Sequence, residues 1–162
     1  MTTESIERVA VLGAGIMGTG IACHLANAGL EVVLLDIPPP DGKGSRNAFS
    51  DGALKKAQKA KPSLIYHKGL FNRIQTGNLE DDLGLLSECQ WVVEAVKEDL
   101  AIKQSLFTKV EEVVNESTII SSNTSGIPLA QLIEGRSESF VERFMITHFF
   151  NPVRYMRLLE LV

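Results

Sequence analysis

Three glycines near the amino terminus, Gly13, Gly15 and Gly18, form the pattern GxGxxG within VLGAGIMGTG. A β-branched run that starts at Arg8 precedes them, and residues with helical spacing follow. Such a loop can bind a dinucleotide: the first glycine allows a sharp turn, the second admits the pyrophosphate, and the third lets the helix pack closely. The N–H groups and positive dipole end of that helix would face the phosphates. The pattern therefore predicts a dinucleotide-binding loop, and a plain strand-to-helix turn is the alternative.

Asp36 ends the next apolar run, where a carboxylate can serve the same cofactor. It can accept hydrogen bonds from a ribose 2′-hydroxyl and it repels a 2′-phosphate, so it favours NAD over NADP. Ile37 follows, so no arginine stands directly after Asp36 to bind that phosphate. Taken alone, Asp36 is also typical of an aspartate that initiates a turn.

His148, in the stretch THFFNP, is a second residue that could do chemistry. The unperturbed pKa of histidine is near neutral, which suits a general base. His148 and Glu160 are symmetric about Arg154, so a chain reversal over residues 151–155 would set them side by side. A carboxylate there fixes the imidazole tautomer and stabilises the imidazolium. The alternative is a hydrogen-bonded core histidine with Glu160 exposed on its strand.

These residues need a scaffold of alternating strands and helices. The sequence predicts strands at residues 8–13, 31–37, 73–77, 91–96, 117–122, 144–149 and 158–162, and helices at 16–28, 47–61, 99–115 and 129–133. This alternation predicts an α/β fold of the Rossmann type: a doubly wound, mainly parallel sheet with helices on both faces and extra carboxyl-terminal strands. The apolar run Leu158 to Val162 is expected to be a buried strand, and Pro38 to Arg46 an exposed loop. The stretch 61–76 is too weakly patterned for its elements to be assigned.

Composition argues against several classes of protein. The chain has 162 residues, 44% of them hydrophobic, which suits one domain with its own core. A net charge of −4 does not favour a nucleic-acid partner, and no apolar run approaches the ~20 residues of a membrane helix. The amino terminus lacks the basic and apolar regions of a signal peptide. Cys23 and Cys89 have no metal-type spacing and indicate core residues in a reducing compartment. We therefore expect a cytoplasmic protein with no metal, nucleic-acid or membrane partner.

Three further motifs follow the glycine loop GAGIMG in order: WVVEAVKED at 91–99, SSNTS at 121–125 and THFFNP at 147–152. Together they resemble the 3-hydroxyacyl-CoA dehydrogenase family of fatty-acid β-oxidation over nearly the whole chain. The large multifunctional bacterial members look most similar. The resemblance implies NAD as cofactor, an acyl-CoA as substrate, and oxidation of an L-3-hydroxyacyl-CoA to the 3-ketoacyl-CoA.

The resemblance also implies roles for single residues. His148 would be the general base, Glu160 the carboxylate that orients it, and Ser125 a hydrogen-bond partner of the substrate near the reacting oxygen. The residues implied in cofactor binding are Gly13, Gly15, Ile16, Met17, Gly18, Asp36, Glu98, Lys103, Ser125 and Asn151.

Several of these roles have simpler alternatives. Ser125 is also typical of a helix cap ahead of Pro128. Asn151 precedes a proline and is typical of a turn. Glu98 and Lys103 would suit the exposed start of a helix, where an acid complements the helix dipole.

Coenzyme A contacts are less clear from the sequence. The family binds coenzyme A through a serine and a lysine in the second helical region, and here Ala53 and Ala60 fall at those places. A basic cluster nearby could substitute for them: Lys55, Lys56, Lys59, Lys61 and Lys68. A solvated helix face explains this cluster equally well.

The resemblance has a consequence for domain organisation. Residues 1–162 would be the NAD-binding domain, and the helical domain that serves substrate binding and dimerisation in the family is absent from this sequence. We therefore expect a truncated chain with low activity by itself, whose full-length form is a homo-oligomer. Two alternatives stay open: a non-catalytic NAD(H)-binding module, which needs no base, and a related NAD-dependent hydroxyacid dehydrogenase, which would leave His148 unexplained.

Overall fold

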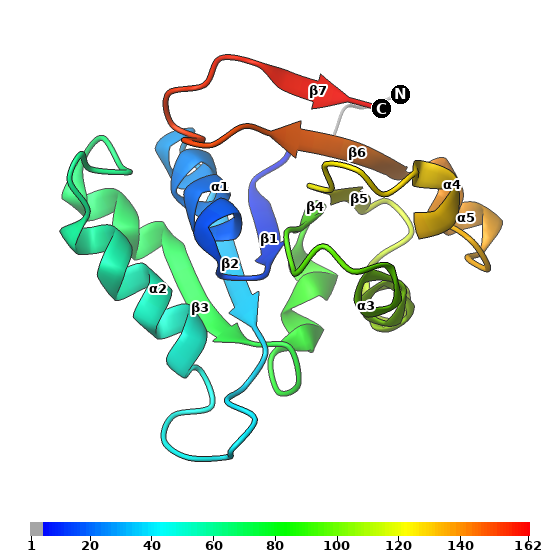
Figure 1. Ribbon diagram of the computed structural model, residues 1–162, viewed down its shortest axis with the longest axis horizontal. Coiled ribbons are helices and arrows are strands. Elements are labelled where there is room, and N and C mark those ends of the chain that lie inside the picture. Colours follow the sequence, from blue (N-terminus) through cyan, green and yellow to red (C-terminus); the bar gives the residue numbers. More distant parts are fainter. Residues whose placement is uncertain (1–4) are drawn as a thin grey trace.

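The computed structural model describes residues 5–162, which form a seven-stranded sheet between layers of helices (Figure 1). The strand order is β3-β2-β1-β4-β5-β6-β7. The strands are β1 (Arg8–Leu12), β2 (Glu31–Asp36), β3 (Ile74–Asn78), β4 (Trp91–Glu94), β5 (Ile119–Ser122), β6 (Phe144–Phe149) and β7 (Leu159–Leu161). All neighbouring pairs are parallel except β6 and β7. The predicted Rossmann-type fold is confirmed, with the reversal of strand order lying between β1 and β4.

Helices cover both faces of the sheet (Figure 1). One face carries α1 (Ile16–Asn27) and α2 (Ala48–Lys59), and the other carries α3 (Leu100–Val113), α4 (Leu129–Leu132) and α5 (Glu138–Glu142). Two 3₁₀ segments, η1 (Lys68–Arg73) and η2 (Leu83–Glu88), flank β3. The stretch 61–76, which the sequence left unassigned, thus holds η1 and the start of β3. Among the residues described, no helix has the length and apolar character needed to cross a membrane.

The core consists of two apolar clusters, one on each side of the sheet. Successive residues of a strand face opposite sides, so Val9 packs beneath α1 and α2 whereas Ala10 packs beneath α3. Because both sides are covered, the central strands are continuous apolar runs rather than alternating ones. Cys23 and Cys89 lie one in each cluster, as expected, and burial raises the pKa of each thiol to about 11.

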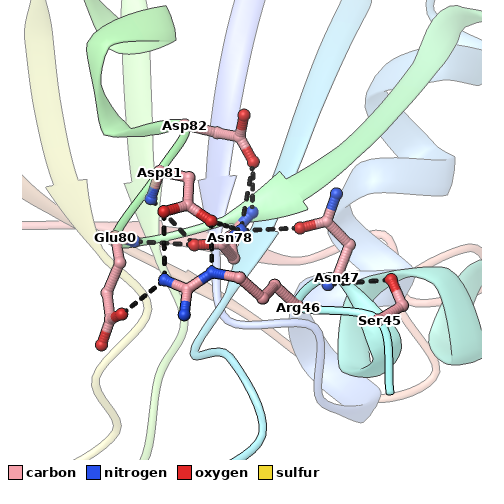
Figure 2. Close-up of polar contacts among 7 residues, drawn as sticks. All are labelled: Ser45, Arg46, Asn47, Asn78, Glu80, Asp81 and Asp82. Atoms are coloured by element: carbon pink, nitrogen blue, oxygen red, sulfur yellow. Dashed lines mark hydrogen bonds and ion pairs between the residues drawn. The ribbon is translucent and has the colours of Figure 1, made fainter. Parts of the chain in front are cut away.

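The proline-rich loop after β2 is fastened at its end to the turn after β3 (Figure 2). The guanidinium of Arg46 lies 2.7 Å from a Glu80 carboxylate oxygen and 2.5 Å from Asp81. The side-chain amide of Asn78 donates to the Asn47 side-chain oxygen at 2.7 Å. These contacts hold the start of α2 against the carboxyl end of β3.

The last strand differs from the expectation, which is wrong on burial. All three residues of β7 are exposed, and Leu161 and Val162 keep 63% and 70% of their surface accessible. The strand lies at the edge of the sheet beyond β6, where it has one neighbouring strand instead of two (Figure 1). An apolar run alone therefore did not distinguish an edge strand from a central one.

Candidate active site

The glycine loop joins β1 to α1, and its three glycines meet different surroundings. Gly13 has φ +101°, and a Cβ there would lie 2.6 Å from the Ala95 carbonyl oxygen. A Cβ on Gly18 would lie 1.7 Å from the Gly13 carbonyl oxygen. Gly15 has no heavy atom of the described residues within 4 Å of its Cβ position. Gly13 and Gly18 are thus required by the packing of the protein itself, whereas Gly15 opens a space that a ligand can enter.

Asp36 is held beside this loop at the end of β2. Its Oδ2 accepts the Ala14 N–H at 2.7 Å, and its Oδ1 accepts the Ile37 N–H at 2.7 Å. A cavity of about 530 Å³ opens here, lined by Gly15, Ile16, Asp36 and Asn151 among others. The N-cap of α1 is Gly15, which has no side chain to accept the first helical N–H groups. The cavity therefore combines free N–H donors at one end with a fixed carboxylate.

Two predicted contacts with this cavity differ in their placement. Ile16 is 79% exposed at the cavity wall, whereas Met17 packs against the apolar cluster beneath α1. Within the basic cluster, Lys56 lines the cavity together with Ala53 and Ala60. The side of the cavity formed by α2 is thus mostly apolar, with a cation at its wall.

His148 lies opposite Glu160 in the antiparallel pairing of β6 with β7. Its Nδ1 is 2.9 Å from Glu160 Oε2, and its Nε2 is 3.1 Å from Ser125 Oγ. The chain reversal that the sequence predicted occurs as a turn, in which the Tyr155 N–H donates to the Pro152 carbonyl. A hydroxyl, an imidazole and a carboxylate thus form one hydrogen-bonded series, which is an arrangement able to move a proton.

Ser125 belongs to the loop between β5 and α4, which we call the Ser125 loop (residues 123–127). Within it, the Thr124 hydroxyl accepts the Ile127 N–H at 3.1 Å, while the Ser125 hydroxyl faces His148. The simpler alternative for Ser125, a helix cap, is therefore wrong, because Thr124 makes the local hydrogen bond. A cavity of about 210 Å³ adjoins the loop and is lined by Ser125, His148 and Glu160 among others.

A buried ion pair between Glu94 and Lys103 lies behind the Ser125 loop. Glu94 was not predicted as a site residue from the sequence. Glu94 and Lys103 are 0% and 1% exposed. Lys103 Nζ lies 2.7 and 2.8 Å from the two Glu94 oxygens and 3.2 Å from Glu98 Oε2. The alternative of an exposed helix start is wrong for Lys103. The available signal was an acid inside the apolar run WVVEAV, since a buried charge requires a partner.

Glu98 connects this ion pair to the Ser125 loop. Its Oε1 accepts the Thr124 hydroxyl at 2.5 Å, the Ser125 N–H at 3.0 Å and the Gly126 N–H at 3.3 Å. Burial raises the pKa of Glu98, but the hydrogen bonds from Thr124 and Lys103 and the charge of Lys103 outweigh it. The pKa of Glu98 therefore lies below its ordinary value.

The predicted residues thus fall into two groups at the carboxyl ends of the parallel strands, where ligands bind in such sheets. Gly15, Ile16, Asp36 and Asn151 surround the larger cavity. Ser125 and Glu160 each contact His148, and Glu98 and Lys103 lie behind the Ser125 loop.

Comparisons with known proteins find relatives over nearly the whole chain. A family model described as "3-hydroxyacyl-CoA dehydrogenase, NAD binding domain" matches residues 8–162. A probable 3-hydroxyacyl-CoA dehydrogenase of Deinococcus radiodurans is 50% identical over 97% of this chain and 45% of its own length. One of Bacillus subtilis is 44% identical over 98% of this chain and 22% of its own length. The chain therefore spans less than half the length of these relatives.

Solved structures show the same relationship. The crystal structure of FadB2 from M. tuberculosis has a TM-score of 0.78 at 33% identity, over 98% of this chain and 54% of that one. The 3-hydroxybutyryl-CoA dehydrogenase of Escherichia coli has a TM-score of 0.80 at 27% identity, over 98% and 32% of the two chains. The chain belongs to the 3-hydroxyacyl-CoA dehydrogenase family and corresponds to its NAD-binding domain.

Proposed function

We propose that this chain is the NAD-binding and proton-transferring part of an enzyme that oxidises an L-3-hydroxyacyl-CoA to the 3-ketoacyl-CoA. The observation that supports this most directly is the series Ser125–His148–Glu160. A module that only binds NAD has no need of an oriented base. A role in fatty-acid oxidation is supported by a putative fatty acid oxidation complex trifunctional enzyme of Rickettsia felis, which is 44% identical to this chain.

NAD is the cofactor of this domain family, and the larger cavity fits it. Gly15 leaves room for a pyrophosphate beside the α1 N–H groups, and the fixed Asp36 carboxylate suits ribose hydroxyls. We assign the cofactor contacts to the residues implied by the resemblance: Gly13, Gly15, Ile16, Met17, Gly18, Asp36, Glu98, Lys103, Ser125 and Asn151. When bound, NAD supplies an acceptor for the hydride that leaves the carbon bearing the hydroxyl.

The proton is handled by the chain's own residues. His148 Nε2 takes the proton of the substrate 3-hydroxyl, because Nδ1, facing Glu160 at 2.9 Å, keeps its hydrogen. Glu160 stabilises the imidazolium that results. The Ser125 hydroxyl, 3.1 Å from Nε2, hydrogen-bonds the same substrate oxygen as it becomes a carbonyl. One proton thus passes to His148 for each hydride transferred.

Lys56, at the wall of the larger cavity, is a cation that coenzyme A phosphates could approach. A second domain that encloses the acyl group is proposed for the whole protein, because the relatives from Deinococcus radiodurans and Bacillus subtilis are more than twice as long as this chain. A homo-oligomer is proposed from the family resemblance alone.

The test combines binding with turnover. NADH and NADPH are titrated by fluorescence, and acetoacetyl-CoA reduction is followed at the nicotinamide absorbance band. We expect NADH to bind more tightly than NADPH. His148→Ala should lower turnover by about 10²–10⁴-fold with little change in NADH affinity, while the exposed histidine variant His67→Ala serves as the matched control. NADH binding without His148-dependent turnover would favour a non-catalytic module. A failure to bind either nucleotide would contradict the proposal at its root.

A further inference from the structure

We propose that Glu94, Lys103 and Glu98 form a positioning unit that holds the Ser125 loop against His148. The inference rests on the proposed function, because it concerns how the serine of that site is placed. The three residues come from β4, from α3 and from the connection between them. None of the three touches the His148 ring in the described structure; they act through the loop.

Glu98 is in direct contact with the Ser125 loop. One oxygen, Glu98 Oε1, accepts donors from three successive residues, Thr124, Ser125 and Gly126. Two of these donors are backbone N–H groups, so the contact fixes the loop backbone and not only a side chain. The direction of the Ser125 hydroxyl toward His148 is therefore tied to the position of Glu98.

The hydrogen-bond donors of Lys103 are fully engaged by the two acids. Its ammonium has three N–H donors, and three carboxylate oxygens lie within 3.2 Å of Nζ: both oxygens of Glu94 and Oε2 of Glu98. The side chain is only 1% exposed. A lysine so enclosed has its donors engaged by the two acids, so it holds the Glu98 carboxylate in a fixed position relative to Glu94.

Glu94 is attached to the middle of the sheet. Glu94 pairs in register with Leu12 of β1 and Ser122 of β5. Its Oε1 accepts the Val96 N–H at 2.7 Å, and its Oε2 accepts the Ser122 hydroxyl at 2.5 Å. The unit thus joins the rigid centre of the sheet to a loop that begins directly after β5.

The charges of the unit agree with this placement. Two carboxylates and one ammonium sum to one net negative charge. Glu94 and Lys103 are fully enclosed, whereas the Glu98 side chain is 44% exposed. The excess charge can therefore reside on the residue that water reaches, beside the loop.

The same chemistry occurs at the other end of α3, where it provides a matched control. Glu111 accepts the Ser137 N–H at 3.1 Å and the Ser137 hydroxyl, and it faces Arg136 at 3.2 Å. That carboxylate anchors the start of α5, away from the series around His148. Glu111→Ala therefore removes an equivalent anchor from a different part of the fold.

The activity test is a double-mutant cycle of Glu98→Ala and Ser125→Ala, read on acetoacetyl-CoA turnover together with NADH affinity. We expect Glu98→Ala to lower kcat, measured at saturating NADH, by about 10- to 100-fold, so that the loss is separate from any weakening of NADH binding. In the Ser125→Ala background the further loss should be below about twofold, because the serine to be positioned is gone. Glu111→Ala should leave kcat within about twofold. The inference would be overturned if the kcat loss of the double variant equalled the product of the two single losses. It would also be overturned if Glu98→Ala affected NADH affinity alone.

A second readout does not depend on activity. Amide hydrogen exchange is measured by NMR in wild type, Glu98→Ala and Glu111→Ala. Exchange at Ser125 and Gly126 should accelerate about tenfold or more in Glu98→Ala only, with Phe107 of α3 as the internal reference. Unchanged exchange at both amides would overturn the inference even in an active protein. Accelerated exchange in a protein without NADH binding or turnover would support the anchor and refute only the proposed function.

Discussion

The glycine loop and the series around His148 both lie at carboxyl ends of strands in one sheet. The first is formed by the backbone, whereas the second is formed by side chains. The loop is shaped by backbone: the Gly13 N–H donates to the Leu35 carbonyl at 2.7 Å, and a Cβ at Gly13 would strike Ala95. The series around His148 is made of side chains that meet across 12 and 23 residues of sequence. One part of the site requires that side chains be absent, and the other requires that they be present.

This difference predicts opposite sensitivities. Added atoms should damage the glycine loop, whereas removed charges or acceptors should damage the series around His148 and the unit behind it. The balance between loss of stability and loss of function should also differ between the variants of the two parts.

Lys103→Met should have the largest effect on stability. It leaves the Glu94 carboxylate, 0% exposed, without its partner ammonium, which costs about 3–5 kcal/mol of unfolding free energy. Urea unfolding measures the loss. Lys109→Met, on the exposed side of α3, should change stability by less than about 0.5 kcal/mol. Adding Glu94→Gln to Lys103→Met should recover part of the loss, and a cost below about 1 kcal/mol for Lys103→Met alone would contradict the assignment.

Gly13→Ala should come next, because it combines a left-handed backbone with a clash. The strain costs about 1–2 kcal/mol and the overpacking against Ala95 about 1–3 kcal/mol. Gly15→Ala is the sharper comparison, since no atom of the described residues meets its Cβ. It should change stability by about 1 kcal/mol or less yet weaken NADH binding about tenfold or more, by filling the space of the pyrophosphate. Equal effects of the two variants on stability would argue against this division of roles.

Glu160→Gln should affect turnover without affecting stability. The Glu160 side chain is 53% exposed, so its loss should cost less than about 0.5 kcal/mol in urea unfolding. Turnover should fall about 10- to 100-fold at unchanged NADH affinity, because His148 loses the negative charge that stabilises its imidazolium, and the amide NH2 of Gln competes with its oxygen for the place of the acceptor. Glu116→Gln, an exposed acid elsewhere, is the control. Normal turnover in Glu160→Gln would mean that the negative charge of Glu160 is not needed by His148.

The smallest expected effect is that of Glu98 on the unfolding free energy at low pH. The folded pKa of Glu98 lies below the ordinary value of 4.5, so its ionised form is favoured by folding. That contribution is present above pH 4.5 and is lost as the pH falls from there through the folded pKa. Glu98→Gln should therefore flatten the decline of unfolding free energy in this window, measured by urea unfolding at several pH values. A decline identical to that of wild type would contradict the prediction.

Much of the fold could be predicted from the sequence, because its signals are local. Gly29 follows the C-cap of α1 in a left-handed conformation with φ +92°, and Pro38 follows β2 closely. The buried parallel strands are continuous apolar runs. Burial of β7 could not be predicted, since the same kind of run occurs there on an exposed edge strand.

The site was predictable only where its geometry follows from the chain itself. The pairing of His148 with Glu160 follows from a reversal centred on Arg154. The contact of Ser125 with His148 depends instead on a loop held by Glu98, and the enclosure of Lys103 depends on how α3 packs over β4. Those are properties of tertiary packing, which no spacing in the sequence specifies.

The short length of β7 has a consequence for how reliably the base is oriented. Three exposed residues hold Glu160 in register with His148, and elements with so little buried surface open locally at small free-energy cost. The orientation of the imidazole is then a matter of population: an opening cost of about 1 kcal/mol would leave roughly one molecule in six with Glu160 displaced. Any contact that buries Leu159 and Leu161 would raise the fraction of molecules in which Glu160 stays paired with His148. Burial of these apolar side chains would thereby increase the fraction of molecules in which His148 is oriented to accept a proton. No group that touches substrate would have to change.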